Sequence, residues 1–209
     1  MSCIQPGSIP RMKLYITVPS PFARKCRIVA REKGLISRIE EIAVDPYANA
    51  PELLASNPVV QVPTLIAEDG VAINDSPVIC EYLDALGTGP RLLPADGPAR
   101  LRVRRLETLG NQALEMGVKL VLEKRRPEAE QSASWIARWT DNMGRALDAL
   151  EAIRPDPDDL DIGVITTGVA VTWIGFRHPG FDLTTGRPGL MALRTALEAR
   201  SSFVETHPA

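Results

Sequence analysis

The sequence predicts a small α/β domain of βαβαββα order followed by an all-helical bundle. Strand and helix patterns alternate over the first third of the chain, whereas only the helical period of about 3.6 residues appears in the second half. A segment rich in Pro and Gly separates the two patterns, which is typical of a linker. We therefore expect a tail over 1–12, the α/β domain over 13–87, a linker over 88–98 and the helical domain over 99–209.

The elements of the first domain follow from local signals. The segment KLYIT (13–17) predicts the first strand. Ser20-Pro21 then opens a helix that ends at Gly34, because Pro suits the first helical position and Gly the residue just past the last. The remaining elements are expected in this order: a strand over 38–44, a short helix over 51–56, two strands within 62–74 around the turn Asp69-Gly70, and a helix from Ser76-Pro77 to Gly87.

The second domain shows helical signals alone. Two long stretches carry apolar residues at i, i+3 or i+4 spacing and predict amphipathic helices. The segment 162–176 is apolar almost all round, so we expect it at the buried centre of the bundle, and Pro188 opens a last helix over 188–202. The apolar positions of the two long helices are Val103, Leu106, Leu109, Ala113, Met116 and Leu120, then Trp135, Trp139, Met143, Ala146 or Leu147, and Leu150.

Composition excludes several classes of protein. The chain has 209 residues, 44% of them apolar and 24% charged, with a net charge of -2, so nothing favours binding to nucleic acid. No apolar run has the roughly 20 residues that cross a bilayer, and the first residues lack the pattern of a secretory signal. Three cysteines without a C-x-x-C pair argue against a disulfide framework and a zinc site. We expect a soluble cytoplasmic protein with no metal, nucleic-acid or membrane partner.

The start of the first helix is the candidate reactive position. In a thioredoxin-like βαβαββα domain the working residue lies there, where aligned peptide dipoles and unpaired N–H groups favour a thiolate. This chain has Ser20-Pro21-Phe22-Ala23 at that point, with a hydroxyl and a methyl group where a dithiol enzyme needs two cysteines. Disulfide exchange by the chain's own cysteines is therefore excluded, and a reactive thiol must come from another molecule.

With these residues the sequence resembles the glutathione S-transferase family, particularly its bacterial members with an active-site serine. The resemblance implies glutathione as co-substrate, a small electrophilic or hydrophobic second substrate, and a homodimer. It extends over nearly the whole chain after residue 12. The motifs are SPFARKCRIVAREKG (20–34), NPVVQVPTL (57–65) and NDSPVICEYLD (74–84), followed by the all-helical remainder.

The resemblance also assigns roles. Ser20 would donate its hydroxyl proton to the glutathione sulfur and stabilise the thiolate that attacks the electrophile. Val62, before a cis Pro63, would bind the cysteinyl part through its backbone. Ser76 would hold the γ-glutamyl carboxylate at a helix N-terminus and Asp75 the γ-glutamyl amine.

A pocket for the electrophile is expected between the two domains. Phe22, which also belongs to the expected glutathione site, Met116 and Trp173 are the candidates to line it. Each of these three residues can equally be ordinary core.

The other motifs have alternatives as well. Ser20, Asp75 and Ser76 are residue types that cap helices, and Pro63 can be a trans proline at a strand entrance. At the level of function, the alternatives are a non-catalytic binding protein with the transferase fold, or a glutathione-dependent isomerase, peroxidase or dehalogenase.

Overall fold

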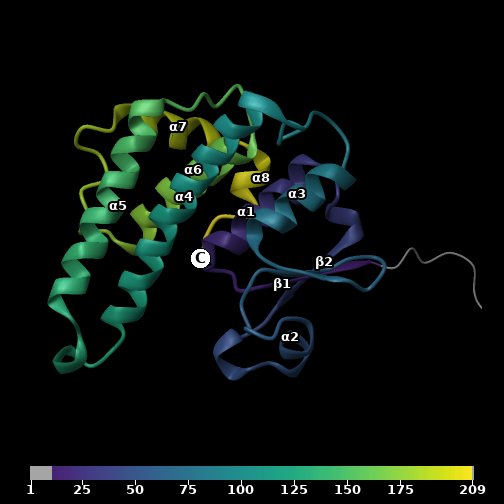
Figure 1. Ribbon diagram of the computed structural model, residues 1–209, viewed down its shortest axis with the longest axis horizontal. Coiled ribbons are helices and arrows are strands. Elements are labelled where there is room, and N and C mark those ends of the chain that lie inside the picture. Colours follow the sequence, from purple (N-terminus) through teal and green to yellow (C-terminus); the bar gives the residue numbers. More distant parts are fainter. Residues whose placement is uncertain (1–10, 209) are drawn as a thin grey trace, which may run out of the picture.

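The computed structural model describes residues 11–208, and all but the last two residues of the expected tail over 1–12 lie outside them. A mixed sheet organises the first domain, and strands β1 and β2 are labelled in Figure 1. The sheet has four strands in the spatial order β2-β1-β3-β4. Strand β2 pairs parallel to β1, whereas β3 pairs antiparallel to β1 and β4 antiparallel to β3. The strands are β1 (Met12–Ile16), β2 (Ile39–Ala43), β3 (Thr64–Ile66) and β4 (Ala72–Ile73).

Three helices accompany this sheet. Helices α1 (Pro21–Glu32) and α3 (Ser76–Leu86) pack against each other, and both lie above the strands in Figure 1. The short helix α2 (Pro51–Ser56) lies below the strands and contacts β3. All three start with Pro within their first two positions, because its fixed φ suits the first turn. The element order predicted from the sequence, βαβαββα, is confirmed.

The second domain is a helical bundle, as predicted. Helices α4 (Gly97–Lys124) and α5 (Ala133–Ile153) form a long hairpin on one side, and α6 (Ile162–Arg177) lies against α4 in the interior. Every residue of α6 from its start to Ile174 is buried. Close packing depends on Gly163, since a Cβ there would lie 2.6 Å from that of Leu106. Among the described residues, no helix combines the length and hydrophobicity that a membrane span requires.

The C-terminal region differs from the prediction. Instead of one helix over 188–202 the chain forms α7 (Pro188–Glu198) and α8 (Ser201–Val204). Arg200 between them has an extended backbone, with φ -77° and ψ 139°. Its guanidinium pairs with the carboxylate of Glu32 in α1 at 2.9 Å, so a contact between domains accompanies the break.

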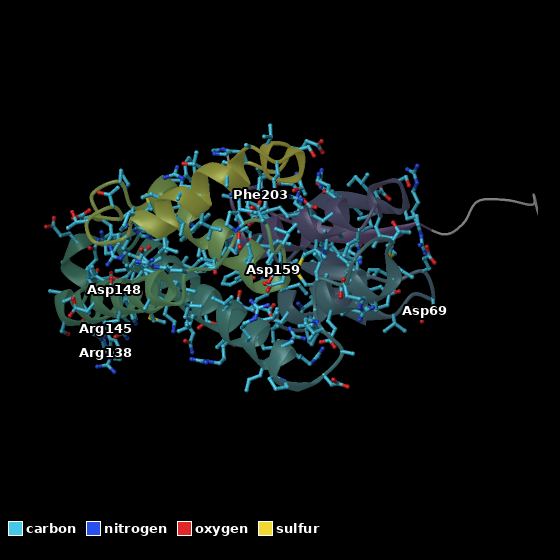
Figure 2. The ribbon with its side chains drawn as sticks, turned by 90° about the horizontal axis from the view of Figure 1, so that it is seen from above. Asp69, Arg138, Arg145, Asp148, Asp159 and Phe203 are labelled. Atoms are coloured by element: carbon cyan, nitrogen blue, oxygen red, sulfur yellow. The ribbon has the colours of Figure 1, made fainter. Side chains whose placement is uncertain are left out.

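The two domains share a continuous apolar core, and charged groups cross their boundary. Arg24 of α1 is buried, donates to Glu198 of α7 at 3.0 Å and lies over the ring of Phe203, 5.3 Å from its centroid. Phe203 is labelled at this junction in Figure 2. Lys25 of α1 is buried as well and pairs with Glu107 of α4 at 3.1 Å. The start of α1 is therefore held by the helical domain as well as by the sheet.

Candidate functional site

The three motifs singled out in the sequence meet at one end of the sheet. Tyr15 of β1 pairs with Thr64 of β3, so residues 62 and 63 lie beside the point where β1 ends and the chain turns toward Ser20. Leu65 pairs in turn with Ile73 of β4, which brings the start of α3 to the same end. The strand register thus gathers the turn before α1, the entrance of β3 and the start of α3.

Ser20 is the N-cap of α1. Its backbone is extended, and its hydroxyl oxygen accepts the amide proton of Ala23 at 3.2 Å. Its own N–H donates to the carbonyl of Thr17 at 3.0 Å, which closes the turn. The side chain is half-buried. Within residues 11–208 the hydroxyl proton has no hydrogen-bond acceptor, so it is available to a ligand at the positive end of the helix dipole.

Val62 precedes a cis peptide bond to Pro63, as the resemblance implies. No backbone hydrogen bond joins the N–H or C=O of Val62 to another residue of the described chain. The residue is only half-buried, while Pro63 is buried. An unpaired backbone donor and acceptor at a partly exposed strand entrance can bind an extended peptide in the manner of an added strand.

The loop that presents Val62 is built around Asn57, a buried residue that the sequence analysis did not single out. Its amide nitrogen donates to the carbonyl of Gln61 at 3.1 Å and to Oγ1 of Thr64 at 2.9 Å. Its amide oxygen accepts the N–H of Val59 at 3.1 Å. The signal in the sequence was the pair Asn57-Pro58, since Asn commonly folds back on the backbone in turns.

Asp75 and Ser76 begin α3. Asp75 is the exposed N-cap, and its carboxylate accepts the N–H of Ser76. Ser76 is fully buried, and its hydroxyl has no hydrogen-bond partner among the described residues. Buried hydroxyl groups without a partner are costly and uncommon. This unpaired hydroxyl, at the positive end of the α3 helix dipole, fits a site that a ligand completes.

Of the three residues predicted to line a substrate pocket, Phe22 and Met116 are half-buried against the core. Trp173 is only 3% exposed, and its indole N–H donates to the carbonyl of Pro19 at 2.8 Å. Little of the ring is accessible to a substrate, and its role in lining a pocket stays a prediction. Two open cavities lie elsewhere, one of about 430 Å³ along β1 and β3 near Ser56 and one of about 330 Å³ along α4.

The cysteines of α1 and α3 are structural. Cys26 and Cys80 are fully buried with their sulfur atoms 3.8 Å apart, and the Cys26 thiol also lies 3.8 Å from the carbonyl of Ser76. Burial, with the hydrogen bond and charge of Cys80, raises the pKa of Cys26 well above its usual value. A protonated buried thiol is a poor nucleophile. In the part of the chain that the structure describes, no group of His, Cys, Asp and Glu side chains is arranged to hold a metal.

Comparison with known proteins gives a consistent result. The family model described as the N-terminal domain of glutathione S-transferase matches residues 19–86. The uncharacterised GST-like protein YibF of Escherichia coli K12 is 35% identical, over 94% of this chain and 98% of that protein. Maleylacetoacetate isomerase of Pseudomonas aeruginosa is 30% identical over 69% of this chain and 70% of the isomerase. A stringent starvation protein A homolog of Pasteurella multocida is 36% identical over 46% of each chain.

Solved structures agree with this likeness. A glutathione transferase family member from Pseudomonas fluorescens Pf-5, crystallised with bound glutathione, superimposes with a TM-score of 0.91 at 30% identity, over 95% of this chain and 99% of that one. A glutathione S-transferase from Methylobacillus flagellatus KT, also with glutathione bound, has a TM-score of 0.85 at 31% identity, over 95% and 100% of the two chains.

Proposed function

Because the chain belongs to the glutathione S-transferase family, we propose that it is a glutathione transferase that activates the thiol of glutathione for attack on a small electrophile. One observation supports the proposal most directly: the hydroxyl group of Ser20, the unpaired backbone of Val62 and the unpaired hydroxyl of Ser76 all lie at the same end of the sheet. Two similar structures were solved with glutathione bound, which supports this ligand.

In this proposal glutathione is held at three points. The cysteinyl backbone pairs with the N–H and C=O of Val62, beside the buried ring of Pro63. The γ-glutamyl carboxylate accepts a hydrogen bond from the hydroxyl of Ser76 at the positive end of the α3 dipole, and the carboxylate of Asp75 pairs with the γ-glutamyl amine. Each group of the ligand thus meets the protein chemistry that complements it.

The chemistry depends on Ser20. Its hydroxyl donates a hydrogen bond to the glutathione sulfur, and the N-terminal end of α1 adds a positive potential. Both favour the thiolate, so the thiol proton is lost to solvent near neutral pH. The sulfur then forms a bond to the electrophilic carbon, and the electron pair displaced there leaves with a departing group or is protonated. Phe22 and Met116, with Trp173 behind them, would provide the apolar surface for that substrate.

We propose further that the enzyme is a cytoplasmic homodimer that acts in detoxification. Two free, buried cysteines fit a reducing compartment. Leu101 is 63% exposed on α4 and lines an open groove with Arg104, Arg105 and Leu109, which fits a surface that a second copy covers. Light scattering tests this: Leu101→Glu should convert a dimer into a monomer, whereas Leu122→Glu at the far end of α4 should not. A wild-type monomer would contradict it.

Calorimetric titration with glutathione tests the binding site. Wild type should give saturable heat, and Ser76→Ala should weaken binding about tenfold, the value of roughly one hydrogen bond to a charged group. Ser132→Ala is the matched control, because it removes another helix-capping hydroxyl, at the start of α5, away from the sheet. Equal heats from wild type and Ser76→Ala, or no heat from wild type, would contradict the proposal.

Two relatives define the alternatives. The likeness to maleylacetoacetate isomerase over 69% of the chain favours a glutathione-dependent isomerase as second candidate. It would bind glutathione and need Ser20 but would not consume the thiol, so counting free thiols during turnover distinguishes isomerisation from conjugation. A binding protein without turnover, in line with the partial likeness to a stringent starvation protein A homolog, would bind no glutathione.

A further inference from the structure

We propose that Trp173 is a positioning residue for Ser20: through one hydrogen bond, the helical domain fixes the direction of the hydroxyl that activates the thiol. This inference rests on the proposed function, because the hydroxyl needs a direction only if it serves a sulfur. It adds a role to a residue that the resemblance places only in the substrate pocket.

The peptide unit between Pro19 and Ser20 is fixed at both ends. Its carbonyl oxygen accepts the indole N–H of Trp173 at 2.8 Å, and its N–H donates to the carbonyl of Thr17 at 3.0 Å. Because a peptide group is planar and rigid, two hydrogen bonds on opposite edges fix its orientation. That orientation sets where the Cα of Ser20, and with it the hydroxyl, is placed at the start of α1.

The indole ring itself has little freedom. It is 3% exposed, and Gly117 of α4 lets it approach so closely that a Cβ at that position would lie 2.7 Å from Cζ3 of the ring. His178 lies edge-on to it, with ring centroids 5.9 Å apart and an interplanar angle of 70°. The Nε2 atom of His178 is in turn 3.1 Å from the carbonyl oxygen of Gly117. Contacts from α4 and from the end of α6 therefore fix the donor.

A buried tryptophan needs some partner for its N–H, so the bond alone could serve packing. What points to positioning is the choice of partner, because the acceptor is the carbonyl oxygen of Pro19, which belongs to the peptide group that joins the turn to Ser20. Thr172, the neighbour in α6, donates its hydroxyl to Glu198 of α7 at 2.6 Å, the carboxylate that also pairs with Arg24 of α1 at 3.0 Å, but it makes no hydrogen bond to this turn. Thr172→Val is therefore a strict control: it loosens the contacts of α6 with α7 and, through Glu198, with α1, but it leaves the bond to the Pro19 carbonyl intact.

The test compares Trp173→Phe, which keeps an aromatic ring and removes the N–H, with Thr172→Val. Three quantities are measured: the glutathione affinity, kcat with an activated aryl halide, and the pKa of the bound thiol from the ultraviolet absorbance of the thiolate. In Trp173→Phe we expect kcat to fall about tenfold and the pKa of the bound thiol to rise by about one, the effect of roughly one hydrogen bond. Affinity should change less than about twofold, because other residues hold the peptide.

Unchanged kcat and thiol pKa in Trp173→Phe, or equal losses in Thr172→Val, would overturn the inference. Gly117→Ala covers the case in which Trp173→Phe fails to fold, since it keeps the indole N–H but displaces the ring, and with it the donor, from the Pro19 carbonyl. The same losses are expected from it.

Amide hydrogen exchange at Ser20, measured without glutathione, separates this inference from the proposed function. Exchange should be several-fold faster in Trp173→Phe than in Thr172→Val, because the turn is released, and equal rates would overturn the positioning role. If the pKa of glutathione's thiol is the same bound to wild type as in solution, the proposed function fails instead.

Discussion

The hydroxyl oxygen of Ser20 accepts the amide proton of Ala23 across 3.2 Å at the first turn of α1. This capping bond uses a lone pair of the oxygen and leaves the hydroxyl proton free, since a serine hydroxyl is both donor and acceptor. Helix capping and thiol activation are therefore compatible roles of one side chain. The two roles can be tested separately by replacing the hydroxyl with a group that accepts hydrogen bonds but cannot donate one.

Ser20→Asp makes this separation. Its carboxylate can still cap α1 but has no proton to donate and adds a negative charge beside the sulfur, so conjugation should fall at least about 100-fold. Ser20→Ala should show a similar loss of activity and also lose about 1 kcal/mol of stability, because the cap is gone. Initial rates and urea unfolding measure the two effects.

Ser20→Thr is the matched control for that comparison. It keeps both the acceptor and the proton, so much of the activity and nearly all of the stability should remain. If Ser20→Asp were as active as wild type, Ser20 would be a helix cap alone.

The Asn57 loop makes a prediction about affinity. Asn57→Asp keeps the acceptor for the N–H of Val59 and loses the two bonds donated to Gln61 and Thr64. Val62 then loses its fixed place, so KM for glutathione should rise about tenfold while kcat changes little. Steady-state kinetics check this, with the distant Asn142→Asp as control. A fall in kcat at unchanged KM would contradict the assigned role of the loop.

A buried ion pair fixes the connection between the domains. Lys33 and Asp84 are at most 1% exposed with nitrogen and oxygen 3.1 Å apart, and Asp84 also accepts the N–H groups of Leu92 and Leu93. Removing one partner leaves a buried charge, so Asp84→Ala should lose about 3–5 kcal/mol of unfolding free energy.

Lys33→Met should cost less than Asp84→Ala, because the carboxylate then keeps both N–H donors and the nearby Arg91. Urea unfolding of the two variants gives the comparison. A larger loss in Lys33→Met would mean that the two N–H donors and Arg91 do not compensate the buried carboxylate once Lys33 is gone.

His178 makes stability depend on pH. Burial, assisted by the positive charges of Lys124 and Arg177 and opposed by the Gly117 carbonyl, lowers its pKa below the ordinary value. As the pH falls, the unfolded chain therefore binds a proton at a higher pH than the folded chain does. The unfolding free energy falls as pH drops below about 6.5 toward the folded-state pKa. His178→Asn should lack this part of the fall, so the wild type should lose more unfolding free energy than the variant between about pH 7 and pH 5. Urea unfolding at a series of pH values measures this, with His207→Asn, a change at an exposed histidine, as the control. Parallel plots of unfolding free energy against pH for the wild type and His178→Asn would contradict the prediction.

Local signals predicted most of the fold. Pro and Gly marked the ends of α1 and α3, and apolar periodicity predicted α4, α5 and the buried α6, because these features depend on neighbours in sequence. The break at Arg200 could not be predicted this way, since the side chain binds Glu32, 168 residues away. Trp135 fitted the apolar stripe of α5 yet is 51% exposed and stacks on Trp139, because α5 borders the bundle and is not enclosed by it.

The candidate site likewise has residues that local motifs predict and residues that only distant contacts reveal. Ser20, Val62 and Ser76 were found because each stands in a motif, whereas the contacts of Trp173 with Pro19 and of Asn57 within its loop appear only in three dimensions. A tryptophan donor and a carbonyl acceptor 154 residues apart leave no mark in the local pattern. Side chains that position a motif are thus harder to predict than the motif itself.

The most direct test of the central claim is the titration of the bound glutathione thiol. Wild-type protein saturated with glutathione is compared with Ser20→Asp, and thiolate absorbance is followed as a function of pH. The account predicts that wild type holds the thiol pKa well below its solution value and that Ser20→Asp restores or exceeds that value, with glutathione still bound in both. An equal thiol pKa in the two complexes would contradict the assignment of thiol activation to Ser20.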